Sequence, residues 1–385
     1  MLTRALALLL AAGVGACGGG IPSATPNDEA SVPGSWSRHD LGVAGPRIHA
    51  VAPGGPGFIG VGAGTMIPGD ETDSAIYTSP DALVWSVVDE PRSGRSLVAV
   101  VPGGPGFVAA SSSPPAIWSS PDGVTWTEAA PSSVFGESTL TSLMAVDDRL
   151  FAGAQGDGLF TSTDGTDWQR ADLGGEPGTV TAIAQGGPGY VAVGSTLVGS
   201  MESKGAVWTS ADGLTWQRLP DAAVFVRSSL HAVAAHDGLL VATGYASDPP
   251  GGGNLFARPS AWTSSDGVTW ERSEVIDPTL PVRDTVTGAL EGALVTSIAR
   301  TADGWLSAGT ALTMEAETMR FDAAMWTSPD GRRWQRVPHN PGFVAGHASS
   351  MQYGAFSLAV SGDRAVVVGR TTGPQTTLWI YPAGS

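Results

Sequence analysis

The chain has 385 residues, a net charge of −16 and a single lysine, Lys204. This acidity argues against a nucleic-acid-binding protein, because such binding depends on neutralisation of phosphates by lysine and arginine. The 53 glycines and 28 prolines, with only 15% charged residues, predict few helices and many turns. A chain of this length can form two ordinary domains or one large repeat domain.

The N-terminus has the pattern of a secretory signal. Residues 1–16 contain Arg4 and then an apolar run that is shorter than the roughly 20 residues of a membrane span. Val14-Gly15-Ala16-Cys17 resembles the lipobox of bacterial lipoproteins, in which the cysteine is lipidated and becomes the new N-terminus. This resemblance implies a lipid anchor at Cys17 and a location on the extracytoplasmic face of the cell membrane. With one cysteine, no disulfide can form within the chain.

A flexible tether follows the predicted lipidation site. Residues 18–34, "GGGIPSATPNDEASVPG", have no hydrophobic periodicity and are rich in Gly, Pro and Ser. We therefore predict a signal peptide at 1–16, the lipidated cysteine and tether at 17–34, and one folded domain at 35–385.

The rest of the sequence repeats a unit of four short predicted strands. The first strand reads "RIHAVA" or "SLHAVA", the second "FIGVG" or "YVAVG", and the third ends at the serine of a motif such as "WTSSDGVTWER" (262–272). The fourth strand begins at the last tryptophan of that motif. Short strands rich in β-branched residues, separated by Gly, Pro and Asp turns at a recurring period, are typical of β-repeat arrays.

The tryptophans count the units and predict how they close. Six units are complete, but the seventh stops at "TTLWIYPAGS" without a fourth strand. The N-terminal Trp36-Ser37-Arg38 is similar to the fourth-strand start Trp168-Gln169-Arg170. Because a closed ring removes the unpaired edges of its sheets, we expect residues 36–38 to complete the last unit. The prediction is an all-β, seven-bladed β-propeller of four-stranded antiparallel blades, whose last blade is closed by the N-terminal strand.

The recurring aspartate of the motif is interpreted as a turn residue. Asp accepts hydrogen bonds from backbone N–H groups of its own turn, and the following Gly supplies a positive φ. The aspartates of this kind are Asp81, Asp122, Asp164, Asp212, Asp266 and Asp330. A shared metal or catalytic site is the alternative, but six residues in six blades lie too far apart to bind one ion.

These motifs resemble the Asp-box (BNR) repeats of sialidase-like β-propellers, although Ser120-Pro121-Asp122-Gly123-Val124-Thr125-Trp126 is one residue shorter than the usual box. The resemblance covers essentially the whole domain at 35–385. It implies the propeller fold and, as one alternative, a glycoside hydrolase with three arginines and a Tyr–Glu pair. Arg47-Ile48 keeps only the centre of the first-arginine motif, and Arg47 is interpreted as a strand-start residue. No convincing Tyr–Glu pair is present, since Tyr353 and Glu291 are distant in sequence, so no catalytic residue is assigned.

Long loops predict where a ligand binds. In such a blade, the loops that join the second and third strands, and those that join successive blades, share one face of the ring, and here the long ones are concentrated in blades 5 to 7. The candidate ligand residues on this face are Asn254, Phe256, Arg258, Arg283, Asp284, Arg320, His347, Gln352 and Tyr353. Tolerated surface insertion is the alternative explanation for the loops. The acidic stretch that contains Asp70 and Asp73 is a lesser candidate for a cation or sugar.

The function predicted from these patterns is a non-catalytic binding or assembly module. The propeller face would hold an envelope protein, peptide or glycan, and the alternative is the sialidase-like hydrolase. The six histidines have no metal-like spacing, so neither a metal nor a cofactor is predicted.

Overall fold

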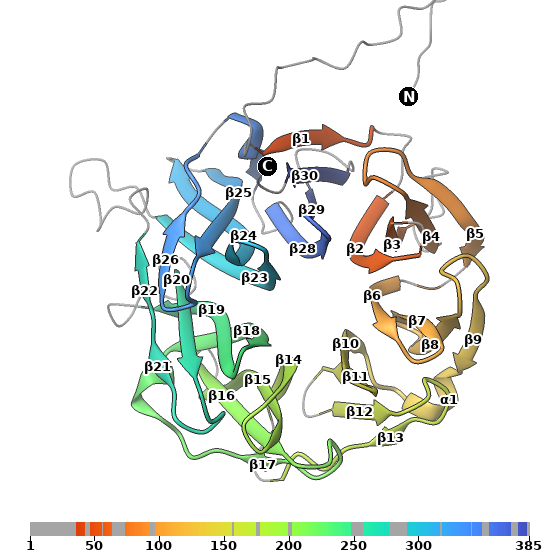
Figure 1. The fold of residues 1–385 in the computed structure, drawn as a ribbon, viewed down its shortest axis with the longest axis horizontal. Helices are drawn as coiled ribbons and strands as arrows, with labels where there is room; N and C mark the ends of the chain where they lie inside the picture. The colour runs from red at the N-terminus through yellow and green to blue at the C-terminus, as the bar shows by residue number, and fades with distance from the viewer. Residues whose placement is uncertain are drawn as a thin grey trace, which may run out of the picture. The chain divides into compact units, whose positions relative to one another are not determined.

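The computed structural model arranges seven mainly antiparallel sheets around a ring, with one edge strand of each sheet innermost (Figure 1). This arrangement confirms the predicted seven-bladed propeller. The structure describes residues 36–42, 47–55, 57–63, 74–92, 95, 97–155, 158–174, 178–198, 202–247, 257–276, 291–315, 318–339, 341–348, 354–370 and 376–382. The predicted signal peptide, Cys17 and the tether lie outside these residues.

The blades follow the chain in order, and each begins at its inner strand. Blade 1 contains β2 (Arg47–Gly54), β3 (Gly57–Ala63), β4 (Ser74–Ser79) and β5 (Ser86–Arg92). Blade 2 contains β6 (Leu97–Gly103), β7 (Gly106–Ser111), β8 (Ala116–Ser120) and β9 (Thr127–Ala130). Blade 3 contains β10 (Leu140–Val146), β11 (Arg149–Ala154), β12 (Gly158–Ser162) and β13 (Gln169–Arg170).

The second half of the ring repeats the pattern. Blade 4 contains β14 (Thr179–Gly186), β15 (Gly189–Val198), β16 (Glu202–Ser210) and β17 (Gln217–Arg218). Blade 5 contains β18 (Ser228–His236), β19 (Leu239–Ser247), β20 (Ala257–Ser264) and β21 (Glu271–Arg272). Blade 6 contains β23 (Glu291–Thr301), β24 (Gly304–Glu315), β25 (Thr318–Ser328) and β26 (Arg333–Arg336).

The two ends of the domain share blade 7. It is formed by β28 (Gly354–Ser361), β29 (Arg364–Arg370), β30 (Thr376–Pro382) and the N-terminal β1 (Ser37–Asp40). In this blade Arg38 lies opposite Trp379, as Arg170 lies opposite Phe160 in blade 3. The predicted closure by the N-terminal strand is therefore confirmed, down to its register.

Blade 6 has two strands beyond the predicted four. β22 (Glu274–Ile276) runs parallel to β26 at its outer edge, and β27 (Val344–Ala348) pairs with the N-terminal half of β25. β25 is 11 residues long, so β26 covers only its end and leaves the other half of its edge free for β27. Both extra strands come from the long connections on either side of this blade.

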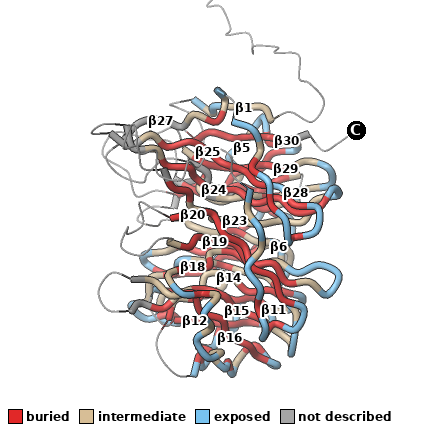
Figure 2. Tube along the Cα trace, turned by 90° about the vertical axis from the view of Figure 1, so that its left-hand side faces the viewer, coloured by how far each residue is buried: buried red, intermediate tan, exposed pale blue. Residues whose placement is uncertain are grey.

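Aromatic side chains and small residues face each other inside the blades. The third-strand aromatic of each blade is buried, and its partner on the second strand is small in the first six blades. The pairs are Gly60 with Tyr77, Ala109 with Trp118, Ala152 with Phe160, Ala192 with Trp208, Ala242 with Trp262 and Ser307 with Trp326. A Cβ on Gly60 would lie 2.9 Å from the Trp85 ring, so bulk here would displace the aromatic layer. Figure 2 shows buried residues along the strands and exposed residues at the turns.

Short helical turns before blades 3, 5 and 7 supply one more aromatic each. These turns are α1 (Ser132–Phe135), η1 (Ala223–Phe225) and η3 (Pro341–Phe343). Phe225 packs against Trp262 and Trp270, with ring centroids 5.9 and 6.1 Å away. Phe343 packs 6.2 Å from Trp36. Trp36 thus takes the place in blade 7 that Trp270 takes in blade 5.

Every inner strand carries one β-bulge at the same position. The registers shift between Ile48 and Ala50, Leu97 and Ala99, Leu140 and Ser142, Val180 and Ala182, Leu230 and Ala232, Val295 and Ser297, and Ala355 and Ser357. A bulge re-aims one side chain and increases strand twist. Two of the bulged side chains reach a backbone carbonyl of the next blade: Thr181 Oγ1 donates to the Leu230 carbonyl, and His231 Nδ1 lies 2.8 Å from the Val295 carbonyl.

Candidate functional site

The structure brings two of the predicted loop-face residues together. Arg320 on β25 lies opposite His347 on β27, although they are far apart in sequence. Arg258 is exposed on β20. The other six candidates fall outside the described residues: Asn254, Phe256, Arg283, Asp284, Gln352 and Tyr353. Asp70 and Asp73 also fall outside them.

Arg320 takes part in a charged cluster on blade 6. Its Nε lies 3.2 Å from Asp322 Oδ2, and His339 Nε2 lies 3.4 Å from the same oxygen. Asp322 is 3% exposed, and its Oδ1 has no hydrogen-bond partner. The Arg320 guanidinium and the His339 ring both contact this one buried carboxylate, and these contacts hold Arg320 in position on β25.

The recurring aspartates of the repeated motif, which we call the box, accept hydrogen bonds from the backbone of their own turns. In blade 2, Asp122 Oδ1 accepts hydrogen bonds from the N–H groups of Thr125 (2.7 Å) and Val124 (2.8 Å), and Trp126 Nε1 donates to the Gly123 carbonyl. These backbone donors, Thr125 first, lower the pKa of Asp122 to about 2. With their lone pairs directed at their own backbone, these carboxylates are turn residues rather than a binding surface.

The divergent copy of the motif in blade 1 has alanine in place of the glycine but keeps the same turn geometry. Asp81 Oδ1 accepts from the Leu83 and Val84 N–H groups, and Trp85 Nε1 donates to the Ala82 carbonyl at 2.9 Å. Ala82 adopts a φ of +65°, where the other boxes have glycine. The hydrogen bonds of the box therefore hold even a residue with a Cβ in the left-handed region.

A cationic group lies where the ring closes, at the junction of blades 7 and 1. Arg47 is the first residue of β2 and Arg370 is the last residue of β29, so both lie on the loop-bearing face. His49, the bulged residue of β2, contacts one of them and is close enough to feel the charge of the other: its Nε2 is 2.6 Å from Arg370 Nη2, and the charge of Arg47 also lowers its pKa. We call Arg47, His49 and Arg370 the closure cations.

His49 is held neutral in this group. Burial lowers its pKa to about 4, with further lowering by the charges of Arg370 and then Arg47. A neutral imidazole accepts a hydrogen bond at Nε2, so it can orient the Arg370 guanidinium without adding a positive charge. The net charge of the closure cations near neutral pH therefore comes from the two arginines.

Arg47 has an unused hydrogen-bonding edge. Its Nε and Nη2 are shielded from solvent and have no hydrogen-bond partner among the described residues. These two nitrogens form the fork that binds a carboxylate or phosphate in bidentate fashion. A buried cationic donor without an acceptor is costly, so the arrangement fits an anionic group that occupies this edge when bound.

Sequence reasoning missed the closure cations as a group. It interpreted Arg47 as a strand-start residue, and it assigned no role to His49 or Arg370. One signal was available, because Arg47 stands at a repeat position that is serine in other blades, at Ser96 and Ser229. No sequence signal placed Arg370 beside it, since the two residues meet only when the ring closes.

The described part of the chain has neither a cluster of side chains for a metal ion nor a helix that could span a membrane. No group of three or more His, Cys, Asp or Glu side chains there is placed to hold a metal ion. No helix there has both the length and the apolar character needed to cross a membrane.

Solved structures share the fold at low sequence identity. A YCF48 structure bound to D1 peptide is 15% identical, with a TM-score of 0.52 over 92% of this chain and 100% of that chain. A chain of the mitotic checkpoint complex is 13% identical, with a TM-score of 0.53 over 100% of this chain and 99% of that chain. A putative glycoside hydrolase from Parabacteroides distasonis is 12% identical over 62% of this chain and 84% of that chain, and its TM-score of 0.37 carries no argument about activity.

Sequence comparison assigns the family more directly than these structures do. No curated protein matches the chain. The profile of the DUF6242 beta propeller domain matches residues 79–337, which run from the end of the third strand of blade 1 to the residue after the last strand of blade 6. The chain therefore belongs to the family of the DUF6242 beta propeller domain.

Proposed function

We propose that this chain is a lipid-anchored protein of the bacterial cell envelope whose propeller binds a carboxylate-bearing segment of a partner protein at the closure cations. The anchor is Cys17, and the tether at 18–34 connects it to the propeller. The observation that carries the binding proposal is the Nε and Nη2 edge of Arg47, which has no hydrogen-bond partner in the described structure and lies near His49, a neutral histidine that contacts Arg370.

The chemistry of the partner follows from the charges. A chain with a net charge of −16 repels polyanions over most of its surface, so two local arginines favour one carboxylate rather than an extended acidic polymer. A peptide C-terminus or an Asp or Glu side chain has that chemistry. The fold-level likeness to a propeller bound to D1 peptide, and to a chain of the mitotic checkpoint complex, supports a peptide or protein partner.

The test compares peptides that differ only in charge. We expect wild-type protein to bind acetyl-tetraalanine with a free carboxylate in preference to its C-terminal amide, measured by calorimetric titration. Arg47→Met should weaken this binding at least about tenfold, because it removes one partner of a shielded charge pair. Arg47→Lys should restore it only in part, because lysine lacks the bidentate edge.

Arg332→Met is the matched control, since Arg332 is exposed in the Asp-box turn of blade 6, on the opposite face of the ring. Equal binding of the free carboxylate and the amide would disprove the closure cations as the site. Preference for sialyllactose, with turnover of a fluorogenic sialoside, would support the glycoside hydrolase alternative instead.

A further inference from the structure

Each Asp-box turn closes a gap between two blades. On the Asp-box face, the box glycine lies against the third residue of the second strand of the preceding blade. A Cβ on the glycine would approach that side chain to between 2.7 and 3.6 Å. The pairs are Gly123 with Ile59, Gly165 with Val108, Gly213 with Phe151, Gly267 with Val191 and Gly331 with Val241.

The gap between blades 6 and 7 has no such cover. The outer strands of blade 7, β30 and β1, come from opposite ends of the chain, so no hairpin turn joins them. Leu306 takes the position of Ile59, because it lies opposite Thr327 as Ile59 lies opposite Thr78. No box glycine lies against Leu306 in the described part of blade 7; Leu306 is 3% exposed and instead packs in one cluster with Trp36 and Tyr381.

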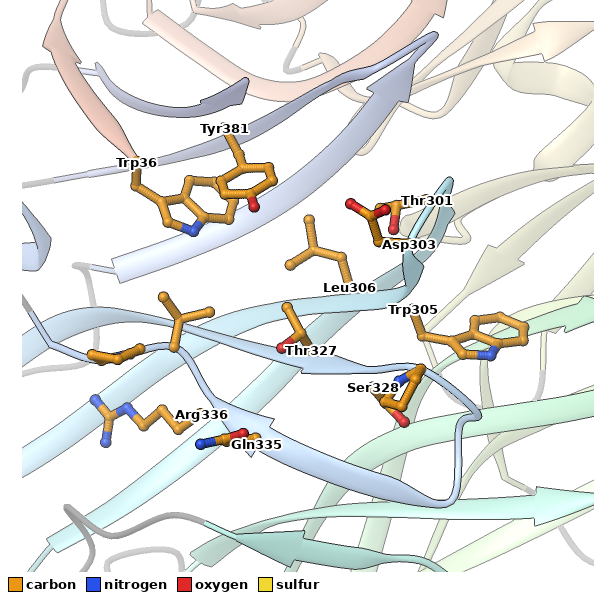
Figure 3. Close-up of a pocket in the computed structure, with 13 residues that line it drawn as sticks. Trp36, Thr301, Asp303, Trp305, Leu306, Thr327, Ser328, Gln335, Arg336 and Tyr381 are labelled. Carbon is orange, nitrogen blue, oxygen red and sulfur yellow. The ribbon is translucent and has the colours of Figure 1, made fainter. Parts of the chain in front are cut away.

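A cavity of about 420 Å³ lies at this place, on residues of both blades. Figure 3 shows Trp36 and Tyr381 next to each other at one side and Trp305 at the other, with Leu306 between them. The centroids of the Trp36 and Tyr381 rings are 5.2 Å apart. Asp303 also lines the cavity. We call this space the closure pocket.

Among the described residues, the closure pocket lacks the backbone carbonyl that accepts the tryptophan hydrogen bond in the other blades. In the other six blades the corresponding tryptophan donates its Nε1–H to the carbonyl of the box glycine, or of Ala82, at 2.9–3.2 Å. Within the described residues Trp36 has no counterpart of that carbonyl. The pocket thus has an apolar side chain, Leu306, and an indole donor, Trp36, at the two positions that a box turn contacts between the other blades.

Two charged side chains line the pocket: Arg336 is 7% exposed and lies over the Trp326 ring, whereas Asp303 is exposed. Asp303 directly precedes Gly304, as Pro105 precedes Gly106, and Pro105 Cδ would lie 3.5 Å from a Cβ on the box glycine Gly165. The exposed Asp303 carboxylate is therefore placed beside whatever turn enters the pocket, and it favours a basic one.

We propose that the closure pocket binds a basic, glycine-containing hairpin turn of a partner protein, in the place that an Asp-box turn takes between the other blades. The glycine lies against Leu306, its carbonyl accepts the hydrogen bond of Trp36, and a basic side chain pairs with Asp303. A second copy of this chain does not supply the turn, because its own box glycines are already packed in their gaps. The site is independent of the closure cations, which lie on the other face.

The probe is a head-to-tail cyclised peptide with the sequence of the blade 6 box, "WTSPDGRRWQR", which contains both the glycine and two arginines in the turn. We expect saturable binding to the full chain by calorimetry, together with a shift of the Trp36 indole N–H resonance. That resonance is assigned by its loss in Trp36→Phe. Replacement of the peptide glycine by valine should weaken binding at least about tenfold, because a Cβ does not fit against Leu306.

Two protein variants and one matched control locate the site. Asp303→Arg reverses the charge beside the turn, and Thr327→Trp fills the pocket from an exposed position, so each should weaken binding at least about tenfold. Asp363→Arg makes the same exposed change at the same turn position of blade 7, where the box of blade 1 already fills the gap, and it should leave binding unchanged. Absence of saturable binding, or equal loss in Asp303→Arg and Asp363→Arg, would overturn the proposal.

Discussion

At the residue scale, three carboxylates couple the hairpin turns to pH. The pKa of each is lowered to about 2, mainly by the backbone N–H of the residue three positions later: Thr125 for Asp122, Asp167 for Asp164 and Thr269 for Asp266. A carboxyl whose pKa is lower in the folded state stabilises the fold above its unfolded pKa near 3.8. That stabilisation is lost as the pH falls through 4 toward 2.

This coupling predicts a specific pH dependence. A triple Asp→Asn variant at these positions keeps an acceptor oxygen but cannot titrate. Wild type should therefore melt at a higher temperature than the variant at pH 6, and the difference should shrink between pH 4 and pH 2. Thermal unfolding followed by circular dichroism measures it, and a difference that stays constant with pH would contradict the assignment.

The box glycines are needed for two separable reasons. Gly123 has a φ of +79°, and an added Cβ would also lie 2.7 Å from Ile59 Cδ1, whereas Gly238, with a φ of +75°, has open space around it. We expect Gly238→Ala to lower the free energy of unfolding by about 1 kcal/mol through backbone strain alone. Gly123→Ala should lower it by about 2–4 kcal/mol, since the steric conflict adds to that strain.

Urea unfolding of the two variants beside wild type separates these contributions. An equal loss of unfolding free energy in both variants would mean that the contact with Ile59 does not contribute to stability.

Residue roles inside a repeat were predictable from sequence because each turn is local. The aspartate, the glycine and the tryptophan of a box interact within seven residues, as Ser120 to Trp126 show. Arg47 was not predictable in the same way, because its surroundings include Arg370 and depend on the closed ring.

At the scale of elements, the N-terminal strand is the main test of the architecture. β1 gives blade 7 its fourth strand, and Thr377 Oγ1 donates to Asp40 Oδ1 at 2.7 Å while Arg38 Nη1 donates to the Val344 carbonyl at 2.9 Å. Without β1, the edge of β30 is unpaired and Trp36 no longer covers Phe343.

We therefore expect deletion of residues 1–42 to lower the free energy of unfolding by at least about 3 kcal/mol, the size of the loss for one large aromatic side chain. The truncated protein should also self-associate through the open edge. Deletion of residues 1–34 is the control, since it leaves β1 in place. Urea unfolding and analytical ultracentrifugation compare the two, and equal stability would refute the closure.

The long connections around blade 6 were predicted as loops, but parts of them are strands. β22 and β27 add to a sheet whose four main strands the repeat already specified. Their sequences match no repeat position, and strand formation there depends on the free edges that β25 and β26 offer. Such pairing depends on tertiary contacts, because a single added strand has little stability of its own.

At the scale of the whole molecule, the proposed lipid anchor has a simple test. Cys17→Ser should release the protein from the membrane fraction, because lipidation of that residue is the proposed attachment. Fractionation and immunoblotting of cells that express wild type and variant provide the measurement. Retention of the variant in the membrane would contradict the anchor, while the propeller itself should be unaffected.

Both proposed sites owe their existence to the way the ring closes. Blades 7 and 1 meet at the closure cations, and blades 6 and 7 meet at the closure pocket. Because the N-terminal strand closes blade 7, no box turn joins the third and fourth strands of that blade. The closure pocket lies where such a turn would pack. Among the described residues, the break in the repeat therefore gives these two junctions features that the other blades do not share.

The sequence by itself determined the number of blades, their strand order, the box turns and the closing strand, because each is written in short-range patterns that recur in every unit. Tertiary structure alone decided which side chains of different blades meet. The contact of Arg370 with His49 joins residues hundreds of positions apart, and the closure pocket lies where blade 7 lacks a box turn. A repeat pattern specifies each unit and its neighbour, whereas such contacts are set only when the last sheet joins the first.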